Sequence, residues 1–202
     1  MSCAAKSPPL VGLRCHDEKV QTTPVVVRVA ASPGDVEAIS RIDTSFSCDR
    51  IYRVSRDGLA FHLDEERVEP RVEKTYPLPS LTLSDRLFVA CAGDETVGFG
   101  ELDFESWNGR ARIGHLAVST PHRGRGAGRA LLQALDERAR NEEAVRCLWL
   151  ETQNVNHPAI QFYRRLGFRL CGLDETLYRP DDPALVPGEV ALFFARDLSD
   201  GI

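Results

Sequence analysis

A run of glycine and arginine residues at 123–129 has the types and spacing to hold phosphate groups: it reads Arg-Gly-Arg-Gly-Ala-Gly-Arg. The apolar segment before it, 113–118, is typical of a strand, and the segment after it has apolar side chains at helical spacing. A glycine-rich turn between a strand and a helix points free backbone N–H groups and the positive helix end at an anion. The run therefore indicates a phosphate or pyrophosphate site, although a glycine run alone also suits a solvated turn.

The helix expected after this run is amphipathic. Its buried face carries apolar residues at helical spacing: Leu131, Leu132, Leu135 and Ala139. The charged residues are expected on the opposite, solvent-facing side: Asp136, Glu137, Arg138 and Arg140. The helix therefore packs through one side and places its first turn at the end of the glycine run.

The glycine spacing excludes the two best-known phosphate loops. A P-loop needs G-x-x-x-x-G-K-[ST], and no Gly-Lys pair followed by Ser or Thr occurs in the chain. A dinucleotide fingerprint needs G-x-G-x-x-G, but a motif started at Gly124 has Arg129 in place of its third glycine. The pattern R-x-x-G-x-G does match, at Arg123, Gly126 and Gly128. It resembles the coenzyme A loop of the GCN5-related N-acetyltransferases, the GNAT family.

A second motif follows the apolar segment 147–152, which is typical of a buried strand. Asn156 lies near a helix start, where Asn is a favoured cap, and Gly167 stands where a C-terminal cap belongs. In the GNAT family this helix carries N-x-x-A-x-x-x-Y-x-x-x-G-F, and the chain matches it at Asn156, Ala159, Tyr163, Gly167 and Phe168. A tyrosine alone would more often be a packed side chain. With both motifs in order, the chain is identified as a member of the GNAT family.

This resemblance implies an α+β fold, in which a mixed, mostly antiparallel sheet is splayed at the cofactor site and flanked by helices. It implies acetyl-CoA as the cosubstrate and no metal. The cofactor-binding residues that it carries over are Leu116, Ala117, Val118, Arg123, Gly124, Arg125, Gly126, Ala127, Gly128, Arg129, Asn156 and Tyr163. By the same resemblance, the Val118 N–H polarises the thioester carbonyl and Tyr163 is the acid that protonates the leaving thiolate.

The base that deprotonates the acceptor amine is where the chain departs from the family pattern. Many members carry a Glu on the strand before the phosphate loop, whereas this chain has Gly114-His115. His115 is suited to act as a base near pH 7, or is simply packed there. Glu151 is the other candidate, because it ends a strand beside the expected cofactor gap. Three acidic residues on the neighbouring strand are available to bind the acceptor cation: Glu101, Asp103 and Glu105.

Further runs resemble the streptothricin acetyltransferases, a group within the family: 42–46, 106–108, 148–156, and 168–174 with 177–178. This resemblance implies a small cationic amine, of the streptothricin antibiotic type, as the acceptor. The acceptor-binding residues that it suggests are Asp43, Phe46, Glu105 and Trp107. A protein N-terminal or lysine acetyltransferase and a non-catalytic acyl-CoA-binding sensor are the alternatives.

Composition bounds the other function classes. The chain has 202 residues, a net charge of −5 and scattered basic residues, so a nucleic-acid partner is not expected. Its six cysteines form no C-x-x-C or zinc pattern, which favours reduced thiols in the cytoplasm. No apolar segment is long enough to cross a membrane. We expect a flexible tail over 1–23 and one GNAT domain over 24–202, either monomeric or paired as a homodimer.

The order of strand and helix patterns is that of an α+β sheet. A first helix is expected from Pro33, with Val36, Ile39 and Ile42 on one face. Strands are expected at 25–29, 52–54, 59–63, 72–76, 87–92, 96–103, 111–118, 147–152, 169–173 and 190–197. Turns are expected at 57–58, 93–94 and 107–109.

Overall fold

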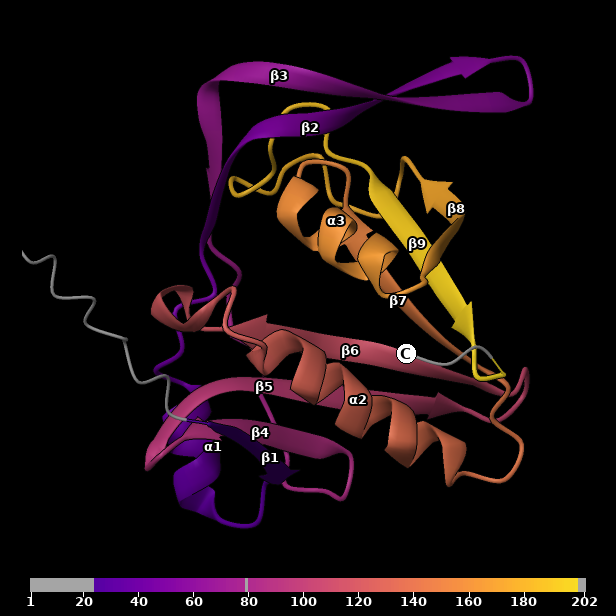
Figure 1. The fold of residues 1–202 in the computed structure, drawn as a ribbon. Coiled ribbons are helices and arrows are strands. Elements are labelled where there is room, and N and C mark those ends of the chain that lie inside the picture. The colour runs from indigo at the N-terminus through magenta and orange to yellow at the C-terminus, as the bar shows by residue number, and fades with distance from the viewer. Residues whose placement is uncertain (1–23, 79, 200–202) are drawn as a thin grey trace, which may run out of the picture.

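The computed structural model describes residues 24–78 and 80–199. Seven strands form one sheet (Figure 1), in the order β1 (Val25–Val29), β4 (Leu87–Ala92), β5 (Glu95–Glu105), β6 (Arg110–Val118), β7 (Cys147–Gln153), β9 (Ala191–Asp197) and β8 (Arg169–Asp174). Neighbours in this sheet are antiparallel except β6 and β7, which are parallel. The α+β class and the mixed, mostly antiparallel sheet are therefore confirmed.

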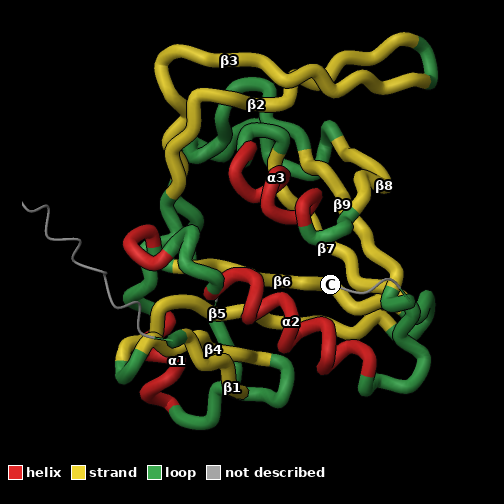
Figure 2. The backbone as a smooth tube through the Cα atoms, viewed as in Figure 1, coloured by secondary structure: helices red, strands yellow, loops and turns green. Residues whose placement is uncertain are grey.

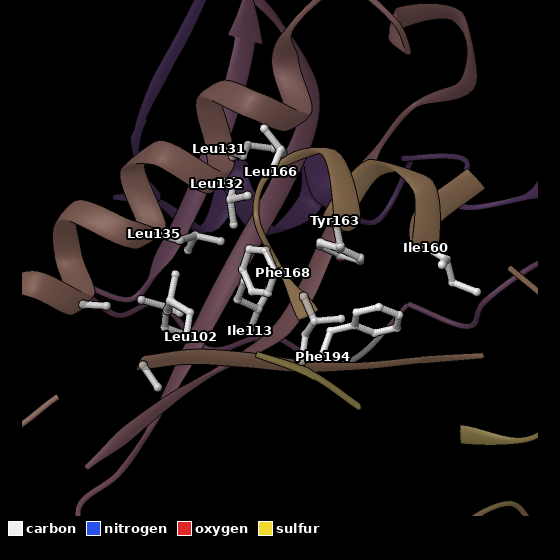
Figure 3. Close-up of a cluster of buried hydrophobic side chains, with 14 of the residues drawn as sticks. Leu102, Ile113, Leu131, Leu132, Leu135, Ile160, Tyr163, Leu166, Phe168 and Phe194 are labelled. Carbon is white, nitrogen blue, oxygen red and sulfur yellow. The ribbon is translucent and has the colours of Figure 1, made fainter. Parts of the chain in front are cut away.

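Helices cover the two faces of the sheet unequally. On one face, α2 (Ala127–Arg140) and α3 (His157–Arg165) enclose the main core (Figure 3), where Leu131, Leu132 and Leu135 are fully buried. On the other face, α1 (Pro33–Ile39) packs on β4 and β5 through a smaller cluster that includes Ile39 and Phe99. Figure 2 shows that α1 and α3 are short, whereas α2 runs along much of the sheet.

The apolar face expected for α2 is confirmed, but its charged face is not uniform. Asp136 is 5% exposed and contacts Arg196 of β9, with Nη2 to Oδ1 at 2.5 Å. Arg140 donates to the other carboxylate oxygen at 2.7 Å. The expectation that Asp136 faces solvent is wrong, because Arg196 is itself buried and needs a counter-charge.

A second sheet has two strands, β2 (Phe46–Asp57) and β3 (Ala60–Lys74), which form a long hairpin over α3 (Figure 1). The turn after Asp57 is where the sequence predicts it, but both strands are much longer than expected. Segment 72–76 is not a separate strand, because most of it completes β3. Leu59 lies in the turn rather than in a strand and is fully exposed.

The buried amide of Asn154 attaches this hairpin to the main sheet. Its Nδ2 donates to the carbonyls of Tyr52 and Gly188, at 2.8 and 3.1 Å, and its Oδ1 accepts from the Val190 N–H at 2.7 Å. The Tyr52 N–H returns a bond to the Asn154 carbonyl. Since Asn154 is 1% exposed, these bonds are shielded from water, and the hairpin is held at one defined place.

The predictions for the N-terminal segment and for the first helix have different outcomes. The tail expected over 1–23 lies outside the described residues, so that part of the domain prediction stays a prediction. Helix α1 begins at Pro33 behind a Ser32 cap and ends at Ile39, so Ile42 is buried from the loop after it rather than from the helix. None of the helices in the described ranges is long and apolar enough to cross a membrane.

Candidate active site

A gap opens in the sheet between β6 and β7. The two strands pair only from Arg110 to Arg112, opposite Cys147 to Trp149, although β6 continues to Val118 and β7 to Gln153. The Ser119 N–H donates to Val97 across β5. Because bonding direction alternates along an antiparallel strand, the N–H groups of Leu116 and Val118 point the other way, into the gap. A ligand carbonyl placed there would meet donors that have no strand partner within the described residues.

Ala117 differs from its two neighbours. It pairs with Phe99 on β5. Its carbonyl also faces Gly98 closely: a Cβ added to Gly98 would lie 2.7 Å from the Ala117 oxygen. Its backbone polar groups therefore serve the β5–β6 ladder. Of the three strand residues predicted to bind the cofactor, the structure turns Leu116 and Val118 toward the gap and Ala117 away from it.

The glycine run forms a loop at the start of α2. Gly124 and Gly126 have φ of +74° and +95°, a region in which only glycine is unstrained. Among the described residues, the N–H groups of 124–126 have no hydrogen-bond acceptor, and those of 127–129 belong to the open first turn of α2. Gly128 allows the loop to approach α3, since a Cβ there would lie 3.3 Å from the Phe162 ring. The loop is thus a row of free donors at the positive end of a helix.

The arginines of this loop have two different environments. Arg123 donates from Nε to the Val118 carbonyl at 2.9 Å, and its own N–H donates to Thr120. It therefore shapes the loop against β6 through Nε, and that it also binds the cofactor stays a prediction. Arg125 and Arg129 are exposed beside the α2 N-terminus, where a positive charge is unfavourable unless an anion is bound.

Tyr163 projects from α3 into the core beside the gap (Figure 3). Its ring makes edge contacts with Phe162 and Phe168, with ring centres 5.3 and 5.6 Å away. Its hydroxyl has no hydrogen-bond partner among the described residues. Burial, with a smaller contribution from the charge of Glu151, raises the pKa of Tyr163 well above its usual value. The phenol therefore stays protonated, as a general acid requires.

Asn156 caps α3, as its position in the sequence predicts. Its Oδ1 accepts from the Ala159 N–H at 3.2 Å, and its Nδ2 donates to Tyr76 Oη at 3.1 Å. Both ends of the amide are thus engaged within the protein. These bonds give Asn156 a role in building the site, and that it also binds the cofactor stays a prediction.

Glu151 lies on β7 two residues beyond the last pair with β6. Tyr178 donates a short hydrogen bond to its carboxylate, and Gln153 Nε2 lies 3.5 Å from the same oxygen. Burial raises the pKa of Glu151, and the negative charge of Glu189 adds to the rise, while the Tyr178 bond and the charges of Lys74 and Arg112 oppose it. A carboxylate with a raised pKa is a better base near neutral pH than an exposed one.

His115 lies on β6 with its side chain 39% exposed, and its Nε2 is 3.9 Å from a Glu101 carboxylate oxygen. Burial lowers the pKa of His115, while the charge of Asp103 opposes this effect. Burial likewise raises the pKa of Glu101. Both base candidates thus border the gap, and the charge of Glu151 contributes to the raised pKa of Tyr163.

One of the predicted acceptor residues, Phe46, lines a cavity of about 520 Å³ at the base of the hairpin, and a second, Asp43, bonds to Thr120 of its lining. Phe46 lines it and stacks on Tyr76, with ring centres 5.8 Å apart. Asp43 lies at its edge, where it accepts from Thr120 Oγ1 at 3.1 Å. Hydrogen bonds from Ser45 lower the pKa of Asp43, so it is ionised at neutral pH.

Glu105 and Trp107 do not join the rest of the site. They lie at the turn between β5 and β6, opposite the end of β6 that borders the gap. Glu105 is already paired with Arg110 at 3.2 Å, and Trp107 is 85% exposed. Strand register thus separates these two residues from the gap, and that they bind the acceptor stays a prediction.

Four side chains that sequence reasoning did not place at the site lie around Glu151: Lys74, Tyr76, Tyr178 and Glu189. Glu189 is 7% exposed and forms an ion pair with Lys74. Tyr76 donates to Gln153, and the Lys74 ammonium lies 5.6 Å from its ring centre. For Glu189 the sequence offers only its position directly before an apolar strand. For Tyr178 it offers only a place in the run 177–178, which resembles the streptothricin acetyltransferases.

Metal ligation is not indicated by geometry. Within 24–78 and 80–199, no three His, Cys, Asp or Glu side chains are grouped so that they could hold a metal ion.

Known proteins resemble this chain in sequence. The model of the acetyltransferase (GNAT) family matches residues 53–168. A streptothricin acetyltransferase from Streptomyces lavendulae is 38% identical over 161 residues, which cover 74% of this chain and 85% of that protein. One from Escherichia coli is 29% identical over 157 residues, covering 76% and 87%.

Two solved structures resemble the whole described fold. The crystal structure of nourseothricin acetyltransferase has a TM-score of 0.75 and 40% identity, covering 86% of this chain and 98% of its own. A protein assigned as a streptothricin acetyltransferase from Bacillus anthracis str. Ames, in complex with acetyl coenzyme A, has a TM-score of 0.72 and 25% identity, covering 86% and 99%.

Proposed function

The chain belongs to the GNAT family of acetyltransferases and is an acetyl-CoA-dependent N-acetyltransferase; we propose that it acetylates a primary amine of a streptothricin-type antibiotic. Its relatives along most of the chain carry the names streptothricin and nourseothricin acetyltransferase, which supports a small cationic acceptor. Acetylation of such an antibiotic would make the protein a resistance enzyme.

The observation that carries the proposal is the gap between β6 and β7, bordered by free donors on one strand and by Glu151 on the other. The pyrophosphate of acetyl-CoA would bind the N–H groups of 124–129, with the α2 dipole behind them. The thioester carbonyl would then lie within reach of the Val118 N–H. A preorganised donor of this kind typically contributes about 2.7–4 kcal/mol to the transition state.

Glu151 would act as the general base. A lysine-like amine has a pKa of about 10.4 and arrives protonated, so one proton must leave before attack. The Glu151 carboxylate takes that proton, and the amine nitrogen attacks the thioester carbon. As the new C–N bond forms, the C–S bond breaks, and the Tyr163 hydroxyl protonates the departing thiolate. The nitrogen loses its second proton to solvent as it becomes an amide, and Tyr163 regains its proton from solvent. His115 is the less favoured base, because its ring lies beside Phe99 and Glu101 of β5.

Acidic groups near the gap would hold the rest of the cationic acceptor. Asp43 and Phe46, at the 520 Å³ cavity, supply an ionised carboxylate and an aromatic wall. Glu101 and Asp103 lie on β5 beside His115. A buried ammonium needs such partners, because desolvating it alone is costly.

A panel of acceptors tests the proposal. Release of CoA thiol would be followed with streptothricin, an aminoglycoside, a polyamine and peptides with free N-termini or lysines. We expect the highest kcat/KM with streptothricin. Preferred turnover of a peptide would favour the protein-acetyltransferase alternative, and binding of acetyl-CoA without turnover of any amine would favour the acyl-CoA sensor. A cytoplasmic location and a homodimer stay predictions.

A further inference from the structure

The segment between β8 and β9, residues 175–190, is fixed at both ends to the β2–β3 hairpin. Glu175 forms an ion pair with Arg56 near the hairpin tip, and Glu189 forms one with Lys74 at its base. The Gly188 carbonyl also accepts from the Asn154 amide at 3.1 Å. In Figure 1 this loop lies between the hairpin and α3. A side chain of this segment can therefore be held in a defined position although no helix or strand carries it.

Tyr178 is the residue of this segment that reaches the candidate base. Its hydroxyl donates directly to Glu151 Oε1, across 27 positions of sequence. Gln153, the second donor near this oxygen, is at 3.5 Å, the outer limit for a hydrogen bond. Tyr178 thus supplies the one close hydrogen bond to the Glu151 carboxylate within the described residues. A bond from a neutral donor to a carboxylate stabilises the charged form over the protonated form.

We infer that Tyr178 is a positioning residue for the acetyl transfer: its hydroxyl aims the Glu151 carboxylate at the acceptor amine and stabilises the carboxylate's negative charge. This inference rests on the proposed function, because it acts through Glu151 as the base. Tyr178 stays a donor in this pair, since burial and the charge of Glu151 raise its own pKa.

The other groups around Glu151 act in both directions. Glu189, which precedes β9, disfavours a second negative charge, and Lys74 of β3 and Arg112 of β6 favour it. Tyr163 of α3 and Tyr76 are neutral, because burial raises the pKa of both phenols. Of these neutral tyrosines, Tyr178 is the one that donates a hydrogen bond to Glu151. Its hydroxyl can therefore change the pKa of Glu151 without changing the charge of the site.

Tyr178→Phe tests the inference, because it removes the hydroxyl and keeps the ring. The acidic limb of the kcat/KM–pH profile reports the pKa of the base in the free enzyme. Losing a hydrogen bond to a charged group should move that limb upward by about one to two pH units. Replacing Tyr178 with 3-fluorotyrosine, a more acidic phenol and stronger donor, should move it downward. A limb that stays in place in both proteins would overturn the inference.

A double-mutant cycle with Glu151→Gln separates this inference from the function on which it rests. If Tyr178 acts through Glu151, then Tyr178→Phe lowers kcat in the wild type but has no further effect in Glu151→Gln. Equal losses in both backgrounds would contradict the positioning role. Full activity and an unchanged acidic limb in Glu151→Gln would instead contradict Glu151 as the base.

Tyr52→Phe is the matched control. The Tyr52 hydroxyl accepts from Gln161 and Arg164 of α3, both at 2.9 Å, and does not contact Glu151. We expect it to lower thermal stability and leave the pH profile unmoved. A shift like that of Tyr178→Phe would show that the profile responds to any lost tyrosine hydroxyl, and would overturn the inference.

Discussion

Arg112 of β6 and Trp149 of β7 form the last pair between these two parallel strands in the described part of the chain. Beyond them β6 keeps its ladder with β5, and β7 keeps its ladder with β9. In the described part of the chain, the inner edges of both strands beyond this pair are therefore left without a strand partner. This divergence of β6 and β7 matters for the proposed catalysis, because it creates donors for a cofactor and brings Glu151 to the edge of the opening.

Gly126→Glu should weaken binding of CoA by about tenfold or more. A glutamate at position 126 would have to adopt the backbone φ near +95°, which strains a residue that has a Cβ. It would also place a negative charge at the helix end proposed to hold the phosphates. Isothermal titration with CoA measures the effect. Gln133→Glu, which adds the same charge to an exposed position of α2, is the control and should bind normally. Equal affinity of a folded Gly126→Glu variant would place the cofactor elsewhere.

Tyr163→Phe should lower kcat by about 10²–10⁴-fold and leave acetyl-CoA affinity unchanged, because only the proton donor is lost. The ring contacts with Phe162 and Phe168 are retained, so stability should change little. Single-turnover kinetics would isolate the chemical step. Wild-type rates in that step would exclude Tyr163 as the acid.

Glu151→Gln should stabilise the protein at neutral pH while removing activity. Folding raises the pKa of Glu151, so the native state binds this proton more tightly than the unfolded state does. As the pH rises from the unfolded pKa through the folded pKa, ionisation of Glu151 therefore lowers the free energy of unfolding. The gain in Tm of the variant should therefore be larger at pH 7.5 than at about pH 4, near the unfolded value. A gain that is the same at both pH values would contradict the raised pKa.

Asp136→Asn should cost about 3 kcal/mol of unfolding free energy or more, because it removes the carboxylate that neutralises the buried Arg196. Urea unfolding measures this directly. The control is Asp85→Asn, whose carboxylate is 66% exposed in its pair with Arg138 and should cost at most about 1 kcal/mol. Similar costs for the two variants would mean that burial of the pair adds nothing.

Local patterns predicted the glycine loop before α2 and the helix α3, because each depends on neighbouring residues. Gly126 must be glycine for its φ, and Asn156 caps the helix that begins one residue later. The strands of the main sheet were likewise found from their apolar runs. Such features depend on short-range geometry and need no knowledge of distant parts of the chain.

Long-range pairing is what the sequence could not supply. Asp136 looks like a surface residue until Arg196, sixty positions later, is placed beside it. Glu105 looks like a neighbour of the site until the register shows it opposite Arg110 at the other end of β6. Tyr178 and Glu189 belong to a segment rich in Pro and Asp, which has no periodicity to indicate the direction of a side chain.

Mass spectrometry of streptothricin incubated with the wild-type protein and acetyl-CoA tests the central claim most directly. The account predicts a product heavier by one acetyl group, with the acetyl located by fragmentation on a primary amine, and no such product from Tyr163→Phe or Glu151→Gln in the same time. Unmodified streptothricin alongside rapid acetylation of a peptide would contradict it.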